Sequence, residues 1–219
     1  MNKTITVKGI GKATAAPDCV VIYMTLKSRN LNYQLAMEEA ANNIDSITSN
    51  LIAVGFDKKD IKTTDFDVRT LYESRKKKDG HYQSEFVGYE VDHDLQLRFD
   101  FDSKTLSNTL AAIASCVANP NFRIAFTVKD KTAINDEMLR SATTNARRKA
   151  EVLCEASGTK LGELLAIDYN WGEISIYSNT HYSMDEDCMC MTAQLPAIEI
   201  EPEEISVSDT ATFVWAISD

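Results

Sequence analysis

The stretch VGYEVDHDLQLRFDF, from Val87 to Phe101, decides the fold. One alternate set of its residues is apolar or aromatic apart from one histidine: Val87, Tyr89, Val91, His93, Leu95, Leu97, Phe99 and Phe101. Because side chains alternate faces along a strand, the pattern predicts one long strand with a dry face and a wet face. A strand of about 50 Å exceeds the usual length, so we expect it to be bent or bulged and central in an antiparallel sheet.

Strands and helices alternate along the rest of the chain. Period-two patterns predict further strands over residues 4–10, 19–27, 64–72, 122–128, 164–171 and 204–217, and apolar stripes predict helices over 37–54, 103–117 and 132–157. Ser103 and Gly158 are expected to cap helices, and Gly55 to end one. The order ββα-ββα-βα-ββ predicts an α+β fold with a mixed, largely antiparallel sheet whose long central strand is covered by helices.

Residues 1–219 are expected to form a single domain, which two sublobes could make up. Within it, residues 172–202 predict an irregular acidic loop, since a connection of that length is normally functional or disordered.

Composition excludes several classes of protein. The net charge of −10 disfavours nonspecific binding to nucleic acid or to anionic membranes. Five scattered cysteines do not form a disulfide framework and predict reduced, packed thiols. No run reaches membrane-spanning length and no apolar leader is present, so we expect a cytoplasmic protein without membrane insertion, or an envelope protein if a leader was removed.

The search for catalytic motifs yields no complete constellation and predicts no catalytic or cofactor-binding residue. Gly9-Ile10-Gly11-Lys12 resembles part of a phosphate loop, but Ala13 stands where a hydroxyl should hold magnesium. A turn between two strands is the favoured interpretation. His93 lies on the dry face of the long strand and is expected to be a buried histidine hydrogen-bonded to a neighbour.

Two further clusters carry charge or soft ligands. The basic run Arg75-Lys76-Lys77-Lys78 predicts a soluble hairpin tip, with an anion-binding patch as the alternative. In the acidic loop, weak metal-ligand candidates are Cys188, Cys190, His181, Asp185 and Asp187. A C-x-C pair lacks the second pair typical of structural zinc, so a mobile surface loop with incidental thiols is favoured and no cofactor is expected.

Several stretches carry a family resemblance. They are ITVKGIGKATAAPDCVVIYMTL from Ile5, VGFDKKDIKTTDFDVRTLYE from Val54, Gly88-Tyr89, and EEISVSDTATFVWAI from Glu203. The most specific is ATTNARRKAEVLCEASGTKLGELLAI, in which the pattern covers Ala146, Lys149, Ala150, Glu151, Gly158, Leu161 and Gly162. Together they resemble the SIMPL domain family (DUF541), which includes bacterial envelope proteins and a signalling protein that associates with a kinase.

The resemblance implies an α+β domain that tends to self-assemble and has no established catalytic activity. We therefore expect a non-enzymatic binding and assembly module that forms homo-oligomers and has a stress- or envelope-related protein partner. The edge strand over residues 4–10, guarded only by Lys8, is the expected site of association. The alternative is a metal- or thiol-handling protein, or an enzyme, that uses residues 172–202. A weaker one is an anion or nucleic-acid binder that uses residues 75–78.

Overall fold

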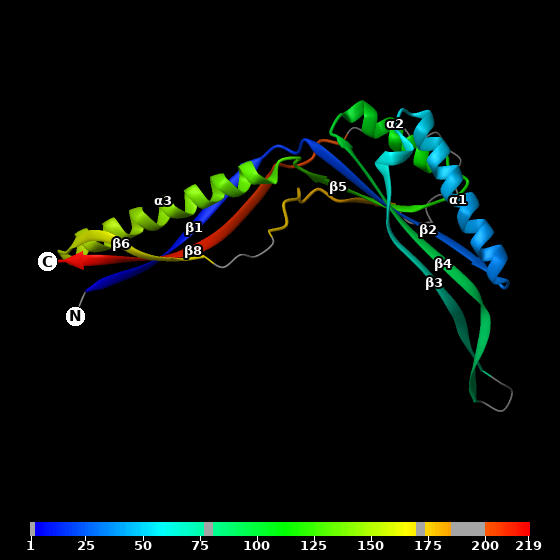
Figure 1. The fold of residues 1–219 in the computed structure, drawn as a ribbon, viewed down its shortest axis with the longest axis horizontal. Coiled ribbons are helices and arrows are strands. Elements are labelled where there is room, and N and C mark those ends of the chain that lie inside the picture. Colours follow the sequence, from blue (N-terminus) through cyan, green and yellow to red (C-terminus); the bar gives the residue numbers. More distant parts are fainter. Residues whose placement is uncertain (1–2, 77–80, 170–173, 185–199) are drawn as a thin grey trace. The chain divides into compact units, whose positions relative to one another are not determined.

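Strands of the chain form two separate antiparallel sheets. The computed structural model describes residues 3–76, 81–169, 174–184 and 200–219. They fall into two compact units, here called the terminal unit (residues 1–18, 127–179 and 202–219) and the central unit (19–126 and 180–201) (Figure 1). The predicted α+β class is confirmed, and the order of helices and strands follows the prediction closely, although two sheets replace the expected one.

The terminal unit joins the two ends of the chain. Its central strand is β8 (Ile205–Ser218), which pairs with β1 (Thr4–Ala15) on one side and β6 (Lys160–Asp168) on the other. The pairing of β1 with β8 is antiparallel and unshifted from Thr4 opposite Ala216 to Ala15 opposite Ile205. The first predicted strand therefore pairs with the last, not with its neighbour in sequence.

Helix α3 (Lys131–Ser157) covers one face of the three-stranded sheet (Figure 1). Asp130 caps its start by accepting a hydrogen bond from the Thr132 amide, and Gly158 ends it at φ 72°. The buried stripe is narrower than predicted and consists of Ile134, Met138, Ala142, Ala146, Ala150 and Cys154. Val152 and Leu153 are apolar residues within the predicted helix range 132–157, yet they are 56% and 52% exposed, because a narrow sheet covers only one line of the helix.

The central unit is built on the predicted long strand. β4 (Tyr82–Asp100) lies between β2 (Cys19–Asn30) and β3 (Ile61–Lys76), and β5 (Asn121–Thr127) and β7 (Tyr182–Met184) follow beyond β2. The expected bulges are confirmed, since the pairing of β3 with β4 shifts register in two places. One shift lies beside Gly88, whose φ of 140° and close approach to the Asn30 carbonyl oxygen require glycine.

Helices α1 (Tyr33–Ala53) and α2 (Ser103–Ala114) pack on the dry face of this sheet. The shared core includes Ile22, Met24, Ile47, Leu51, Leu95, Leu97, Leu106, Ile113, Ile124 and Phe126. Gly55 follows the end of α1 at φ 110°, as predicted, and a short 3-10 helix spans Lys58–Asp60.

The boundaries of α2 differ from the prediction at both ends. Asp102, not Ser103, caps the helix, because its carboxylate accepts a hydrogen bond from the Thr105 amide at 2.7 Å. The helix ends at Ala114, before Asn119-Pro120, so Val117 does not belong to the apolar stripe and is 95% exposed.

Residues 174–184 lie in the stretch expected to be irregular, yet they are packed against the fold. Ile176 is buried in the terminal unit, and Ser178 donates a hydrogen bond to the Glu203 carbonyl oxygen at 2.7 Å. In the central unit, β7 pairs with β5. In the described part of the chain, no helix combines the length and the apolar character needed to cross a membrane.

Candidate functional site

The metal-ligand candidates of the acidic stretch lie largely outside the described residues. Cys188, Cys190, Asp185 and Asp187 belong to residues 185–199, and only His181 is described, as an exposed side chain. Over the described ranges, no three His, Cys, Asp or Glu side chains are grouped so that they could hold a metal ion. The described thiols, Cys19, Cys116 and Cys154, are free and buried, as expected for packed cysteines.

The phosphate-loop resemblance has a different cause. Residues 9–12 lie in the middle of β1, so the predicted turn between strands is wrong. A Cβ atom on Gly9 would overlap the Ala142 carbonyl oxygen, and one on Gly11 would overlap the Met138 carbonyl oxygen. The glycines therefore let β1 lie directly against the backbone of α3.

His93 makes a local structural contact. Its Nε2 atom lies 2.8 Å from the Thr63 hydroxyl, and its ring meets Phe66 edge-on at 5.1 Å between centroids. The side chain is half-buried, and this burial lowers the pKa of His93 while Asp94 opposes the shift. These contacts agree with the prediction that His93 packs on the dry face and is hydrogen-bonded to a neighbour.

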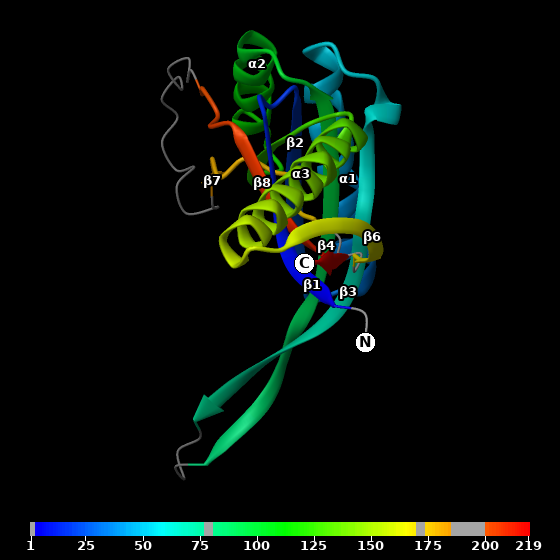
Figure 2. The ribbon, with the colours of Figure 1, turned by 90° about the vertical axis from the view of Figure 1, so that its left-hand side faces the viewer.

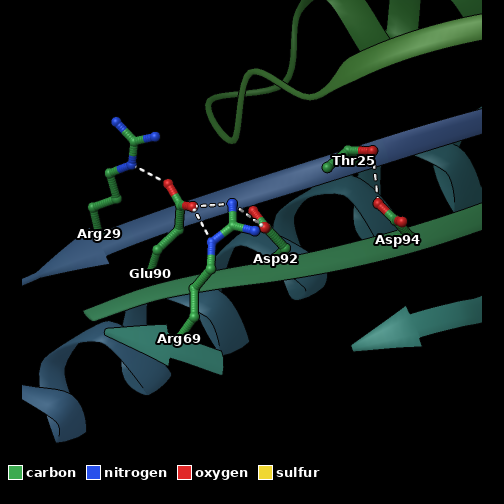
Figure 3. Close-up of polar contacts among 6 residues, drawn as sticks. All are labelled: Thr25, Arg29, Arg69, Glu90, Asp92 and Asp94. Carbon is green, nitrogen blue, oxygen red and sulfur yellow. Dashed lines mark hydrogen bonds and ion pairs between the residues drawn. The ribbon is translucent and has the colours of Figure 1, made fainter. Parts of the chain in front are cut away.

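A charged ladder, here defined as Arg29, Arg69, Glu90 and Asp92, crosses three strands on the wet face of the central sheet (Figure 3). Glu90 on β4 stands directly opposite Arg29 on β2 and Arg69 on β3. Its carboxylate accepts hydrogen bonds from both arginines, including one from Arg69 Nε at 2.8 Å. Arg69 also lies 2.8 Å from Asp92.

The pKa values of the two carboxylates in the ladder are shifted in opposite directions. Burial penalises the charged form of Glu90, whose side chain is 1% exposed, but hydrogen bonds from Arg69 and Arg29 outweigh it and lower its pKa. Burial and the neighbouring Glu90 raise the pKa of Asp92, and Arg69 offsets only part of that shift. One oxygen of Asp92 is buried without a hydrogen-bond partner among the described residues.

This ladder was missed by the sequence analysis, which placed Glu90 on a solvated face. Alternation separates the two faces of a strand but does not report which face is covered. The ladder could have been found by aligning the register of the predicted strands, because Glu90 then faces arginines of opposite charge on the neighbouring strands. Chemically the arrangement is an ion-pair network that holds three strands together.

A two-stranded arm leaves the central sheet beyond this ladder. β2 stops pairing with β4 at Tyr89, and residues 71–76 and 82–88 continue as a two-stranded pair that no third strand among the described residues joins (Figure 2). Neighbouring rings run along it from Tyr72 through Phe86 and Tyr89 to Tyr33, with centroids 5.3 to 5.8 Å apart. On the arm, Arg75 lies 3.5 Å from both Glu73 and Glu85, so this part of the basic run is already paired.

The free edge of β1 is not as open as the sequence predicts. Three side chains of α3, spaced four residues apart, bond its outward backbone groups. Asn145 accepts from the Ile10 amide at 3.0 Å, Ser141 accepts from the Lys12 amide at 3.2 Å, and Lys149 donates to the Lys8 carbonyl oxygen at 3.0 Å. Ser141, Asn145 and Lys149 thus form a seal on the strand edge.

The opposite edge of the same sheet is β6, which pairs with β8 alone among the described strands. Leu164, Leu165 and Ile167 on β6 are 45%, 45% and 57% exposed. An apolar edge strand without a covering element is a template for pairing with another chain. The candidate functional site is therefore a binding surface on β6.

The fold and these surfaces define a two-sheet α+β protein that exposes an apolar strand edge and a stripe of aromatic rings. The chain belongs to the SIMPL family, described as a protein of unknown function (DUF541), which matches residues 5–215. This confirms the resemblance found in the sequence.

Two curated relatives were compared with the chain. Both are called "26 kDa periplasmic immunogenic protein", one from Brucella abortus (strain S19) and one from Brucella melitensis biotype 1. Each is 22% identical over 163 residues, covering 74% of this chain and 65% of the relative. The chain thus matches somewhat less than two thirds of the length of these relatives.

Proposed function

We propose that the protein is a non-enzymatic binding and assembly module that associates with copies of itself through β6. The observation that carries the proposal is the outer edge of β6, which pairs with no other described strand and lies beside the exposed Leu164, Leu165 and Ile167. Pairing of β6 with β6 of a second copy would join two sheets across a two-fold axis and remove both edges.

The charged ladder supports the non-enzymatic part of the proposal. Glu90 is held ionised between Arg29 and Arg69, so its hydrogen-bonding capacity is used within the fold. The described histidine on the long strand is likewise engaged by Thr63 and Phe66. The names of the relatives support an envelope location for the module, which cell fractionation with a periplasmic marker would test.

Light scattering after size-exclusion chromatography tests self-association. The mass should rise above 24.4 kDa as the protein concentration increases about tenfold. Ile167→Lys and Leu165→Lys should return the protein to the monomer mass, because a lysine on an edge strand disfavours pairing. Val117→Lys places the same charge on an exposed site of the central unit and should leave the mass unchanged.

Two results would contradict this proposal. A monomer mass over the whole concentration range would exclude self-association. An oligomer that persists unchanged in the Ile167→Lys and Leu165→Lys variants would exclude β6 as its interface.

A further inference from the structure

The seal on β1 covers only part of the strand. Outward-facing residues alternate along β1, and α3 bonds backbone groups of Lys8, Ile10 and Lys12. By the same alternation Thr6 and Thr4 also face outward, but they pair with no other strand of the described chain. Two residues of open strand edge therefore remain at the beginning of β1.

A hollow of about 370 Å³ adjoins this open edge. Its apolar lining comes from Val7 on β1 and from Val152 and Leu153 on α3, the two side chains that the narrow sheet leaves exposed. Its polar lining is Asn145, Arg148 and Lys149, without a carboxylate.

The charged side chains that line the hollow are both positive. Arg148 and Lys149 line the hollow, and the Lys8 side chain is exposed on the opposite face of β1. None of the three forms an ion pair with a residue that the structure describes. Arg148 and Lys149 thus give the hollow two cations that attract a carboxylate group.

We propose that the start of β1 and the adjoining hollow form a docking site for an extended peptide with alternating apolar and acidic side chains. The peptide adds a strand to β1 and exchanges backbone hydrogen bonds with Thr4 and Thr6. Its apolar side chains enter the hollow against Val7, Val152 and Leu153. Side chains alternate faces, so its acidic side chains lie on the other face beside Lys8, and the carboxylate at its C-terminus pairs with Arg148 in the hollow.

Fluorescence anisotropy tests this site with a labelled octapeptide of alternating valine and glutamate, (Val-Glu)4. We expect saturable binding that weakens with added salt and is weakened at least tenfold by Arg148→Glu. Arg140→Glu makes the same charge change at an exposed site of α3 outside the hollow, and its affinity should stay within twofold of wild type. A peptide of alternating valine and lysine should not bind.

A proline scan separates strand addition from simple charge attraction. Thr6→Pro removes an outward N–H without breaking a bond to β8, and it should abolish binding. Thr14→Pro does the same at the far end of β1 and should bind as wild type does. Circular dichroism confirms that both variants remain folded.

Amide exchange locates the peptide independently. On addition of (Val-Glu)4 the amides of Thr4 and Thr6 should become protected, whereas those of Ile10 and Lys12 should change little because α3 already bonds them. Protection on residues 160–168 would place the peptide on β6 and overturn the proposal. Equal binding to the lysine peptide, or affinity unchanged by Arg148→Glu and Thr6→Pro, would overturn it as well.

Discussion

Gly9 on β1 lies in direct contact with Ala142 on α3, so close that a Cβ atom on the glycine would overlap the alanine carbonyl oxygen. The same Cβ atom would stand 2.8 Å from the Cβ atom of Ala146. The small side chains of Ala142, Ala146 and Ala150 allow the strand to approach the helix backbone closely along this line. Helix and strand thus meet backbone to backbone, and this closeness lets the short side chains of Ser141 and Asn145 reach the edge of β1.

Gly9→Ala should destabilise the protein by about 1–3 kcal/mol, since an added methyl group must push α3 away from the sheet. The seal on β1 should loosen with it, so the Ile10 amide should exchange faster. Lys12→Ala, on the exposed phase of the same strand, should change stability by no more than about 0.5 kcal/mol. Equal unfolding free energies of the two variants in urea would show that the strand does not press on the helix.

Glu90→Gln should destabilise the protein by about 2–3 kcal/mol at pH 7, because hydrogen bonds from Arg29 and Arg69 lose their ionised acceptor. The folded-state pKa of Glu90 is lowered, so its stabilising effect is present above the ordinary glutamate pKa and is lost as pH falls through the folded value. The difference between wild type and variant should therefore shrink towards acid pH. Glu85→Gln, on the exposed arm, provides the control.

Asp92 gives the opposite pH effect, because its pKa is raised by burial and by Glu90. Its charged form costs stability above the folded pKa, and this cost disappears as pH falls. Because Glu90→Gln also removes one cause of this shift, the comparison with and without Glu90→Gln is made in an Asp92→Asn background, which removes the contribution of Asp92. A difference that stays constant down to about pH 3 would contradict the assignment to Glu90.

Leu97→Ala should cost about 2–4 kcal/mol, because Leu97 is fully buried in the core between the central sheet and its helices. Val117→Ala also removes apolar atoms, but from a side chain that lies in solvent. It should change the free energy of unfolding by less than about 0.5 kcal/mol. Chemical denaturation of both variants measures the contrast, and similar values would place the core elsewhere.

Asp102→Ala should lower the melting temperature, whereas Ser103→Ala should leave it unchanged within error. The Asp102 carboxylate accepts hydrogen bonds from both the amide and the hydroxyl of Thr105, each at 2.7 Å. Asp102→Asn should retain most of the stability, since asparagine is also a good helix cap. A larger effect from Ser103→Ala would move the start of α2 by one residue.

The long strand could be predicted because its information is local. Alternation from Val87 to Phe101 identifies the dry face, and Gly88 agrees with the predicted bulge. The helices were also predictable from their stripes and from Gly55 and Gly158. The predicted start of α2 was wrong by one residue, because the adjacent Asp102 and Ser103 can both cap a helix.

Contacts between distant parts of the chain could not be predicted in the same way. Gly9 and Gly11 favour a turn when only their neighbours are considered, but their need for glycine comes from α3, more than a hundred residues later. Glu90 belongs to the wet phase by alternation, and its burial follows from arginines on two other strands. The sequence predicts an open strand edge at β1. Side chains of α3 bond much of that edge, so β6 is the more open edge of the sheet.

The pairing of β1 with β8 also has a consequence for biosynthesis. Thr4 is synthesised more than two hundred residues before its partner Ala216. β6 pairs with the same strand, so neither β1 nor β6 can complete its sheet until β8 has been synthesised. The central unit draws most of its chain from residues 19–126 and can begin to fold earlier. Assembly of the terminal unit therefore has a high contact order, and a stop codon before residue 205 would leave β1 and β6 without their shared partner strand β8, exposed to aggregation and proteolysis.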